Sequence, residues 1–464
     1  MPSATTELKH FDLSKATVRP DGDISTSFNS FGKGETYDSS FWADIKKSLI
    51  KDPVAFKESW LRLKEAFAKG LEEIKEKRGD IIPSVSMDEL SNMDKSKRDE
   101  ILKRGCVVIK GVIPEEEAVG YKEDVLKYVE KNPQTKGFPQ HAKVVYELYW
   151  SKPQVQARAH PNLREASRFM NNLFHADPDA KVLLDQNISY ADRLRVRMPG
   201  DALFMLGPHS DGGSLERWED PAYSACYQKI FDGKWEEFDP NDATHRINAN
   251  MEKYASNGNC NIFRAYQGWL AVSEVAPKEG SILFAPLVKE VTAYWMMSPF
   301  FDENDNLKLD SSLPGTFPGK SQEFNNETHP GLQLDDLMVP VPRVNPGDMV
   351  FWHCDLIHAV DPIHEGTHDS SVFYIPSAPL CDINAKYVAI QREAFLKGLA
   401  GPDFPGFPHG LAETEHEGRA TSEDVEATGG VDALRELGLV PFSAKNLTPG
   451  EAAIVEEANK LLFC

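Results

Sequence analysis

The sequence predicts an α+β fold in which helical segments flank a central region of short strands. Three observations support this prediction: a helical periodicity in the first part of the chain, closely spaced short strands in the middle, and a helix signature near the end. Short strands separated by turn residues are typical of a barrel or a sandwich. At 464 residues, 41% of them hydrophobic, the chain can bury a large core.

The first part of the chain is predicted to be mainly helical. Asp52 and Pro53 are typical of a helix N-cap and first turn, and large apolar residues then recur at spacings of three and four as far as Ile74. A short buried strand is expected over 105–111, and the acidic residues after Pro114 indicate the start of another helix.

The central part is rich in candidate strands, and it is interrupted by two polar stretches, 216–259 and 302–336. Insertions of this length in a compact β core often serve as lids. Near the C-terminus, Thr448 and Glu451 form a capping-box pattern before a helix. The candidate strands are 193–198, 202–206, 261–275, 281–286, 348–353 and 371–375.

We therefore expect a single domain over residues 1–464. Its parts are a mainly helical segment over 1–190, the β core with both insertions over 191–385, and a C-terminal helical segment over 386–464.

The net charge of −21 argues against a nucleic-acid or anionic-membrane surface, because phosphate binding needs a positive surface. We find no apolar run of the roughly 20 residues that span a bilayer and no signal-peptide pattern at the start. The six scattered cysteines indicate neither a disulfide framework nor a zinc knuckle. A cytoplasmic enzyme acting on a small molecule is the expectation.

A candidate metal site is the most informative local feature. His209 and Asp211 are two residues apart, so on an extended strand both side chains point to the same face. With His358 they supply two imidazoles and one carboxylate, a set that leaves coordination positions open and suits non-haem Fe(II) oxygenases. A lone His-x-Asp pair is otherwise common in loops.

His353 competes with His358 as the distal ligand. The two are five residues apart, so on one continuous strand they would point to opposite faces. Cys354 and Asp355 indicate a turn between two strands, which favours His358 on the returning strand as the ligand. His353 would then be a buried histidine bonded to the backbone.

Several arginines near the metal residues are candidates for binding a carboxylate. Arg193, Arg195 and Arg197 alternate with apolar residues and share one strand face. They form either an anion clamp or the solvated face of an edge strand. Arg264 is a second candidate, since a cation among strand-forming apolar residues needs a partner if it is buried.

The chain resembles the phytanoyl-CoA hydroxylase-like branch of Fe(II)/2-oxoglutarate-dependent oxygenases, and more closely a subfamily catalogued as a domain of unknown function. The resemblance extends over nearly the whole chain. It is carried by the segments 191–195, 208–218, 220–223, 263–269 and 352–358, which include Pro208-His-Ser-Asp-Gly-Gly-Ser-Leu-Glu-Arg-Trp218 and Trp352-His-Cys-Asp-Leu-Ile-His358.

This resemblance implies a double-stranded β-helix core of the jelly-roll, cupin-like type, flanked by N- and C-terminal helices. It also implies that His209, Asp211 and His358 bind Fe(II) and carry the catalysis, with 2-oxoglutarate as cosubstrate and O2 as oxidant. The expected activity is oxidation of an unactivated C–H in a small molecule, with amino-acid-like compounds among the candidates, by hydroxylation, desaturation or oxidative cyclisation.

One departure from the family pattern concerns the cosubstrate anchor. Many relatives place an arginine about ten residues after the distal histidine, but residues 365–374 contain no arginine or lysine here. Arg264 is our first choice of anchor, and Arg195 or Arg197 is the alternative, with Ser371 as a hydrogen-bond donor.

The sequence also suggests residues for the substrate. We expect Trp218, Tyr266 and Trp269 to contact it, with Trp218 on the insertion 216–259 acting as part of a lid. The aromatic residues of that insertion have an alternative role, which is to pack it against the core. The missing anchor keeps two other functions open: a metal-dependent dioxygenase that does not use 2-oxoglutarate, and a non-catalytic metal-binding jelly-roll protein.

Overall fold

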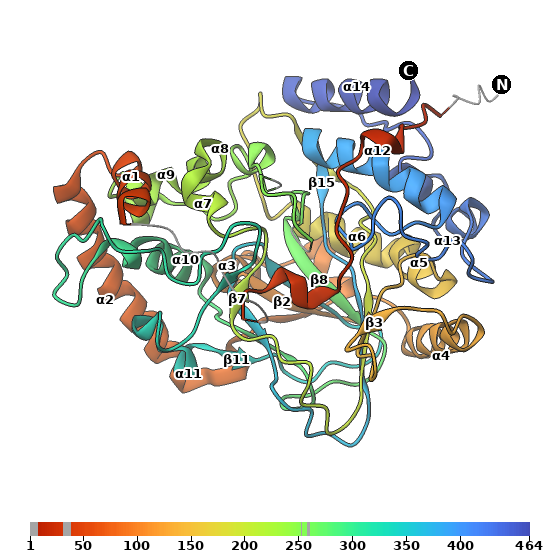
Figure 1. The fold of residues 1–464 in the computed structure, drawn as a ribbon, viewed down its shortest axis with the longest axis horizontal. Coiled ribbons are helices and arrows are strands. Elements are labelled where there is room, and N and C mark those ends of the chain that lie inside the picture. Colours follow the sequence, from red (N-terminus) through yellow and green to blue (C-terminus); the bar gives the residue numbers. More distant parts are fainter. Residues whose placement is uncertain (1–7, 31–38, 252, 258–259) are drawn as a thin grey trace.

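The computed structural model describes residues 8–30, 39–251, 253–257 and 260–464, which form a mixed α+β fold with β-sheets at its centre (Figure 1). The strands are β1 (Ser84–Ser86), β2 (Cys106–Lys110), β3 (Gly137–Phe138), β4 (Val145–Tyr146), β5 (Val182–Asn187), β6 (Leu194–Arg197), β7 (His209–Ser210), β8 (Tyr266–Ala271), β9 (Ile282–Phe284), β10 (Gln322–Glu323), β11 (Val339–Pro340), β12 (Met349–His353), β13 (His358–Val360), β14 (Ser370–Tyr374) and β15 (Pro379–Cys381).

Helices surround these strands on both sides. Figure 1 shows α1, α2 and α10 gathered on the left of the sheets, and α4, α5, α12, α13 and α14 on the right. The helices are α1 (Ser39–Leu49), α2 (Pro53–Lys77), α3 (Lys95–Arg104), α4 (Glu115–Lys131), α5 (Lys152–Ala159), α6 (Pro161–Asn171), α7 (Glu216–Glu219), α8 (Pro221–Ser224), α9 (Gln228–Phe231), α10 (Val288–Met297), α11 (Leu334–Leu337), α12 (Asp382–Lys397), α13 (Ser422–Glu436) and α14 (Pro449–Phe463).

The strands of the described residues form two larger sheets and one pair. The first sheet has the order β1-β2-β12-β8-β14-β6-β4-β3, the second has the order β10-β7-β13-β9-β11, and β15 pairs with β5. Within the first sheet, β12 is antiparallel to both β2 and β8, and β14 is antiparallel to both β8 and β6. The second sheet carries the short strands on which the candidate metal residues lie.

The predicted helices are confirmed. Asp52 caps α2 through hydrogen bonds from the N–H groups of Val54 and Ala55. The apolar stripe of α2 is buried, and Trp60 stacks on Phe301 with ring centroids 5.0 Å apart. The stripe therefore packs the helix into the core, as its spacing indicates.

The strand predictions are confirmed in most cases, with two corrections. The predicted strand 202–206 is wrong: this stretch is irregular, with Leu203 and Met205 exposed. The predicted strand 261–275 shortens to β8. The edge-strand alternative for the arginine face is also wrong, because β6 lies between β14 and β4 and all its residues are buried. The three arginines of this face are thus held inside the protein.

The described residues of the first insertion, 216–251 and 253–257, include several short helical turns, and aromatic residues among them pack inward. Trp218, Tyr223 and Trp235 are buried in the same apolar cluster as α2 and α10. Trp218 meets Trp295 edge to face, with ring centroids 5.3 Å apart. Of the two roles considered for these aromatic residues, the fold therefore supports packing against the core.

The N-terminal segment runs from the C-terminal helix toward the second sheet. The Lys9 N–H donates to the Leu462 carbonyl at 2.9 Å, and the Ser321 N–H donates to the Ser27 carbonyl at 2.9 Å. The next residue, Phe28, is buried against the second sheet. Among the described residues, no helix combines the length and apolar character needed to cross a membrane.

The capping box of α14 gives a direct test of the sequence-derived helix boundary. Thr448 accepts a hydrogen bond from the Glu451 N–H, and the Glu451 carboxylate accepts one from the Thr448 N–H. We expect Thr448→Ala to lower the free energy of unfolding by about 1 kcal/mol in chemical denaturation, because the cap is lost. Thr448→Ser keeps the hydroxyl and should restore the stability; equal losses in both variants would contradict the capping role.

Candidate metal centre

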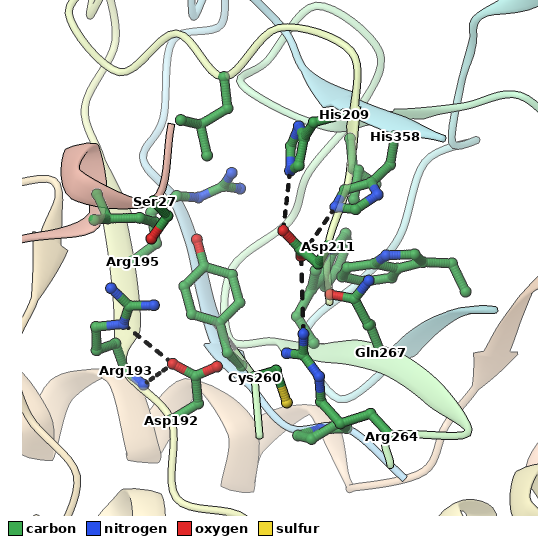
Figure 2. Close-up of a pocket in the computed structure, with 18 of the residues that line it drawn as sticks. Ser27, Asp192, Arg193, Arg195, His209, Asp211, Cys260, Arg264, Gln267 and His358 are labelled. Atoms are coloured by element: carbon green, nitrogen blue, oxygen red, sulfur yellow. Dashed lines mark hydrogen bonds and ion pairs between the residues drawn. The ribbon is translucent and has the colours of Figure 1, made fainter. Parts of the chain in front are cut away.

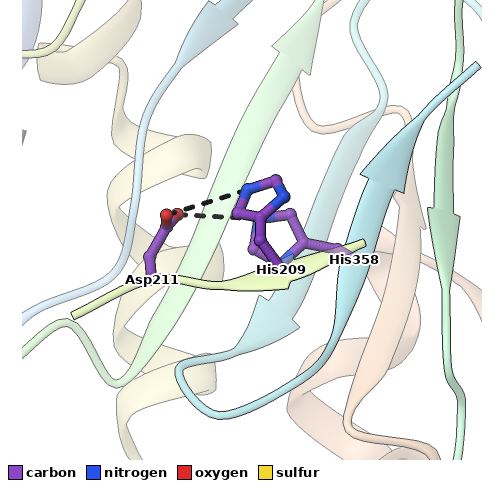
Figure 3. Close-up of side chains that lie close together, drawn as sticks. All are labelled: His209, Asp211 and His358. Carbon is purple, nitrogen blue, oxygen red and sulfur yellow. Dashed lines mark ion pairs between the residues drawn. The ribbon is translucent and has the colours of Figure 1, made fainter. Parts of the chain in front are cut away.

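Two histidines face each other across a pair of antiparallel strands. His358 of β13 lies directly opposite His209 of β7, and their ring centroids are 4.2 Å apart. Asp211 follows β7, two residues after His209, and Figure 3 shows its carboxylate facing both rings. The ligand atoms of the three side chains lie within 4.8 Å of one another. The structure thus brings together the three residues that the sequence singled out.

Backbone carbonyls set the tautomers of both histidines. His209 Nδ1 lies 2.7 Å from the Gly207 carbonyl oxygen, and His358 Nδ1 lies 3.0 Å from that of Leu356. Because a carbonyl only accepts, each Nδ1 carries a proton, and Nε2 is the nitrogen of each ring that is left to bind a metal. Burial, together with the nearby His358, lowers the pKa of His209 to about 4, so this ring is neutral at pH 7.

The two Nε2 atoms point at a group that cannot donate to them. His209 Nε2 is 3.7 Å from Asp211 Oδ1, and His358 Nε2 is 3.5 Å from Asp211 Oδ2. Two imidazole nitrogens and a carboxylate converge, and a divalent cation between them would be bound by all three groups. Two nitrogens and one oxygen on one side of an ion fit the ligand set of an open Fe(II) site.

Three side chains hold the Asp211 carboxylate in place. Ser321 Oγ donates to Oδ1 at 3.1 Å, and Arg264 Nη2 lies 4.0 Å from Oδ2. With its amide nitrogen turned toward Asp211, Gln267 donates to Oδ2 at 2.7 Å while its oxygen accepts from Trp352 Nε1 at 3.2 Å. Such supporting contacts orient a metal ligand and tune its basicity.

A buried ion cluster ties the two ligand-bearing segments together. Arg217 donates to the backbone carbonyl of Asp211 and, at 2.7 Å, to the Asp355 carboxylate in the turn before His358. Arg246 donates to the other oxygen of Asp355. Burial alone would raise the pKa of Asp355, but the two guanidinium groups lower it well below its usual range. This carboxylate therefore stays ionised and links β12–β13 to the segment that contains Asp211.

The same cluster excludes His353 as a metal ligand. The ring of His353 is fully buried, with Nε2 3.0 Å from the Pro240 carbonyl and Nδ1 accepting from the Asp355 N–H at 3.1 Å. Both ring nitrogens are therefore used by the backbone. A second grouping of His353, Cys354 and Asp355 lacks a free ligand set, since both oxygens of Asp355 accept from arginine.

A cavity opens in front of the metal centre, and both larger sheets line it. His209 and His358 come from the second sheet, while Arg195, Trp269 and Tyr374 come from the first. Figure 2 shows Arg193 and Arg195 on one side of this cavity and the two histidines with Asp211 on the other. The N-terminal segment also contributes to the lining, and Phe28 meets His209 edge to face at 4.8 Å.

The arginine candidates differ in how many hydrogen bonds their guanidinium groups donate to other groups of the protein. Arg197 does not line the cavity; it donates to Asp201 and to the carbonyls of Asp361 and Pro362. Arg195 lines the cavity and is 3% exposed; among the described residues it donates only to Ser370 Oγ, at 3.1 Å, and its Nε has no partner. In the part of the chain that the structure describes, no carboxylate lies within 4.0 Å of Arg195.

Four of the expected cosubstrate and substrate residues lie away from the cavity lining: Arg197, Ser371, Trp218 and Tyr266. The Ser371 hydroxyl donates to Asp369, and the Tyr266 hydroxyl accepts from Asn241 at 3.0 Å. Arg195, Arg264 and Trp269 do line it. Tyr266 and Trp269 lie on opposite faces of β8, and alternation alone does not determine which of these faces meets the second sheet.

Sequence reasoning missed several residues that line the cavity or contact Asp211. Gln267 lies within the segment 263–269, whose resemblance to the family was noted, but nothing marked its amide as a partner of Asp211. Asp192 precedes the arginine face, so its position was available from the sequence. Ser321 and Phe28 lie far from the motif in sequence and gave no signal.

Comparisons with known proteins agree with this architecture. A Gig2-like family model matches residues 38–439. The crystal structure of the Candida albicans protein GIG2 (GlcNAc Inducible Gene 2) is similar to this one, with a TM-score of 0.83 and a sequence identity of 31%. The match covers 92% of this chain and 95% of that chain. The Escherichia coli K12 protein YbiU is 34% identical over 72% of this chain and 80% of its own length. A Salmonella typhimurium LT2 structure is 31% identical, with a TM-score of 0.77 over 88% of this chain and 99% of that one.

Metal binding by the purified protein tests the ligand assignment. We expect Asp211→Ala and His358→Ala to abolish stoichiometric binding of Co(II), used as a spectroscopic substitute for Fe(II), because each removes one of three ligands. His353→Gln should keep the Co(II) spectrum although it loses the ring stacked on Phe174. Loss of the spectrum in His353→Gln, with the protein still folded by circular dichroism, would contradict the assignment.

The buried ion cluster predicts two different outcomes for its two arginines. Arg217→Met and Arg246→Met should each lower the free energy of unfolding by about 3–5 kcal/mol, because Asp355 loses one of its partners. Only Arg217 also contacts the Asp211 carbonyl. Arg217→Met should therefore weaken metal binding by about 10–100-fold in addition, whereas Arg246→Met should not. Equal metal affinities in the two variants would argue against a positioning role for Arg217.

Proposed function

We propose that this chain, which belongs to the Gig2-like family, is a non-haem Fe(II)/2-oxoglutarate-dependent oxygenase that oxidises a C–H bond of a small molecule. One observation carries the proposal. Two imidazoles and a carboxylate converge on one wall of a cavity whose other wall presents a buried guanidinium without a carboxylate partner among the described residues.

The donor set fits the proposed metal. His209, Asp211 and His358 would hold Fe(II) through two nitrogens and one oxygen, and the side facing the cavity would stay open for 2-oxoglutarate and O2. The bound iron would supply oxidation, in which substrate C–H, O2 and 2-oxoglutarate give C–OH, succinate and carbon dioxide. The chain's own residues bind, orient and shield these reactants.

Arg195 is the residue that best fits the distal carboxylate of 2-oxoglutarate. Burial lowers the pKa of its guanidinium, since few groups in the described chain offset its charge, and a carboxylate ligand would supply that compensation. Arg264 was the first choice from the sequence, but it already lies 4.0 Å from Asp211 and stacks over Tyr190. In our proposal Arg264 holds the ligand Asp211, and Arg195 anchors the cosubstrate.

The cavity walls support the exclusion of water from the reaction. Trp269 and Trp352 of the first sheet, Ile282 of the second, and Phe28 of the N-terminal segment line it alongside the metal residues. Apolar walls of this kind strengthen charge interactions inside a site by lowering the local dielectric constant. We also propose that the two sheets that share this cavity form the two halves of a double-stranded β-helix.

A spectroscopic titration tests the activity and the anchor together. Anaerobic addition of Fe(II) and 2-oxoglutarate should produce a weak visible charge-transfer band. Arg195→Met should raise the Kd for 2-oxoglutarate by about 10–100-fold, because a charge-assisted hydrogen-bonded pair is lost. Arg168→Met, which removes a half-exposed arginine of α6, is the matched control and should leave the Kd unchanged.

Two outcomes would contradict parts of this proposal. A protein that binds Fe(II) but gives no band with 2-oxoglutarate would point to a metal-dependent enzyme that does not use this cosubstrate. A normal Kd in Arg195→Met, together with a raised Kd in Arg264→Met, would transfer the anchor to Arg264.

A further inference from the structure

The cavity has a second end, away from the metal centre, where a carboxylate faces the open space. Asp192 lies just before β6, is 7% exposed, and lines the cavity together with Arg193, Tyr190 and Phe404. Figure 2 shows its carboxylate on the side of the cavity opposite His209 and His358. The proposed iron-binding chemistry gives this group no role.

Within the described residues, only one of the two carboxylate oxygens of Asp192 accepts hydrogen bonds. Oδ1 accepts from the Arg193 N–H at 2.6 Å and from Arg193 Nε at 3.2 Å. Within the described residues Oδ2 accepts no hydrogen bond. Arg193 therefore fixes the orientation of the carboxylate and leaves one oxygen to accept a donor from a ligand. A carboxylate oxygen that faces the cavity can accept a hydrogen bond from a ligand that enters it.

The charges around Asp192 favour a cationic donor over a neutral one. Arg193 is shared between two carboxylates, because its Nη1 also lies 3.7 Å from Glu147. A third carboxylate, Asp403, lines the same end and lies 4.0 Å from Arg19. Asp192 and Asp403 thus line this end of the cavity, and Glu147 contacts Arg193 from outside the lining, whereas Arg195 and Arg264 make the metal end favourable for anions.

Apolar side chains form part of the cavity lining. Trp269, Leu206, Ile282 and Val360 lie along it, and at the Asp192 end the ring of Phe404 packs 4.9 Å from the Arg193 guanidinium. Apolar walls suit an aliphatic chain, and they strengthen an ion pair formed at the Asp192 end. A ligand with a charged head and a short hydrocarbon body matches both features.

We propose that Asp192, held by Arg193, binds the ammonium group of a small aliphatic amine and so directs a carbon of that substrate toward the metal centre. This inference rests on the proposed function, because it names the substrate class of the same site. Recognition by Asp192 Oδ2 selects a primary or secondary amine, and the apolar walls select its unbranched carbon chain.

The test uses the full chain loaded with Fe(II) and 2-oxoglutarate. The probes are 1,4-diaminobutane, 5-aminopentanoate and L-lysine, with 1,4-butanediol and 5-hydroxypentanoate as uncharged counterparts of the amine group. At least one amine should accelerate succinate formation about tenfold or more under air, and the alcohols should not. If no amine does so in protein that shows the 2-oxoglutarate band, the inference is overturned.

Variants separate recognition from general damage. Asp192→Asn keeps the shape but removes the charge, and it should raise the apparent KM for the active amine by about 10–100-fold, because a charge-assisted hydrogen bond is weakened. Asp185→Asn changes a 68%-exposed carboxylate on β5 and should leave that KM unchanged. A wild-type KM in Asp192→Asn would overturn the inference.

Two further measurements keep the outcome decisive. If Asp192→Asn does not fold, as judged by its melting transition, the preference of the wild-type protein for amines over alcohols decides the question alone. If the wild-type protein shows no 2-oxoglutarate band, the proposed function fails. Calorimetric titration of the Fe(II)-loaded protein with the amines then still tests Asp192: binding weakened by Asp192→Asn supports the subsite, and absence of binding overturns it.

Discussion

The pairing of β7 with β13 is the constraint on which the candidate site depends. It sets His209 opposite His358, but β7 is only two residues long and two strands this short have few ladder hydrogen bonds. The Asp355 carboxylate compensates for this, because Arg217 joins it to the backbone carbonyl of Asp211. A buried carboxylate with two guanidinium partners fixes register more firmly than the ladder alone, since any slip leaves a charge unpaired.

Features that follow from local backbone geometry were predictable from the sequence. The stripe of α2 and the alternation of β6 arise from the periods of 3.6 and 2, and both elements lie where these periods place them. The turn predicted at Cys354 and Asp355 likewise followed from the local sequence, and it places His353 and His358 on separate strands. The strand expected over 202–206 failed because an apolar run is equally compatible with an irregular segment that buries only alternate residues.

Features that depend on contacts between distant segments were not predictable. Arg195 and Arg197 look equivalent in the sequence, yet only Arg197 meets Asp201 and the carbonyl of Asp361 and is thereby withdrawn from the cavity. Arg264 was singled out because a buried cation needs a partner, and the partner is Asp211 itself. The sequence therefore predicted that Arg264, if buried, has a partner, but only the three-dimensional arrangement shows which group it is.

The three arginines that follow one another on one face of β6 and its start have different surroundings and different roles. Consecutive residues on one face of a strand are roughly 6.7 Å apart, so Arg193, Arg195 and Arg197 sample three different environments along a single wall. Arg193 lies beside Asp192 at one end, Arg195 faces the cavity without a carboxylate partner, and Arg197 lies among the carbonyls beyond it. In the proposed enzyme this segment of backbone therefore positions both the cosubstrate anchor and the amine-binding carboxylate. Asp192 and Arg195 are three residues apart on the same segment of backbone, so this segment sets the spacing between the amine-binding carboxylate and the cosubstrate anchor, which in turn limits the length of the substrate that can reach the metal.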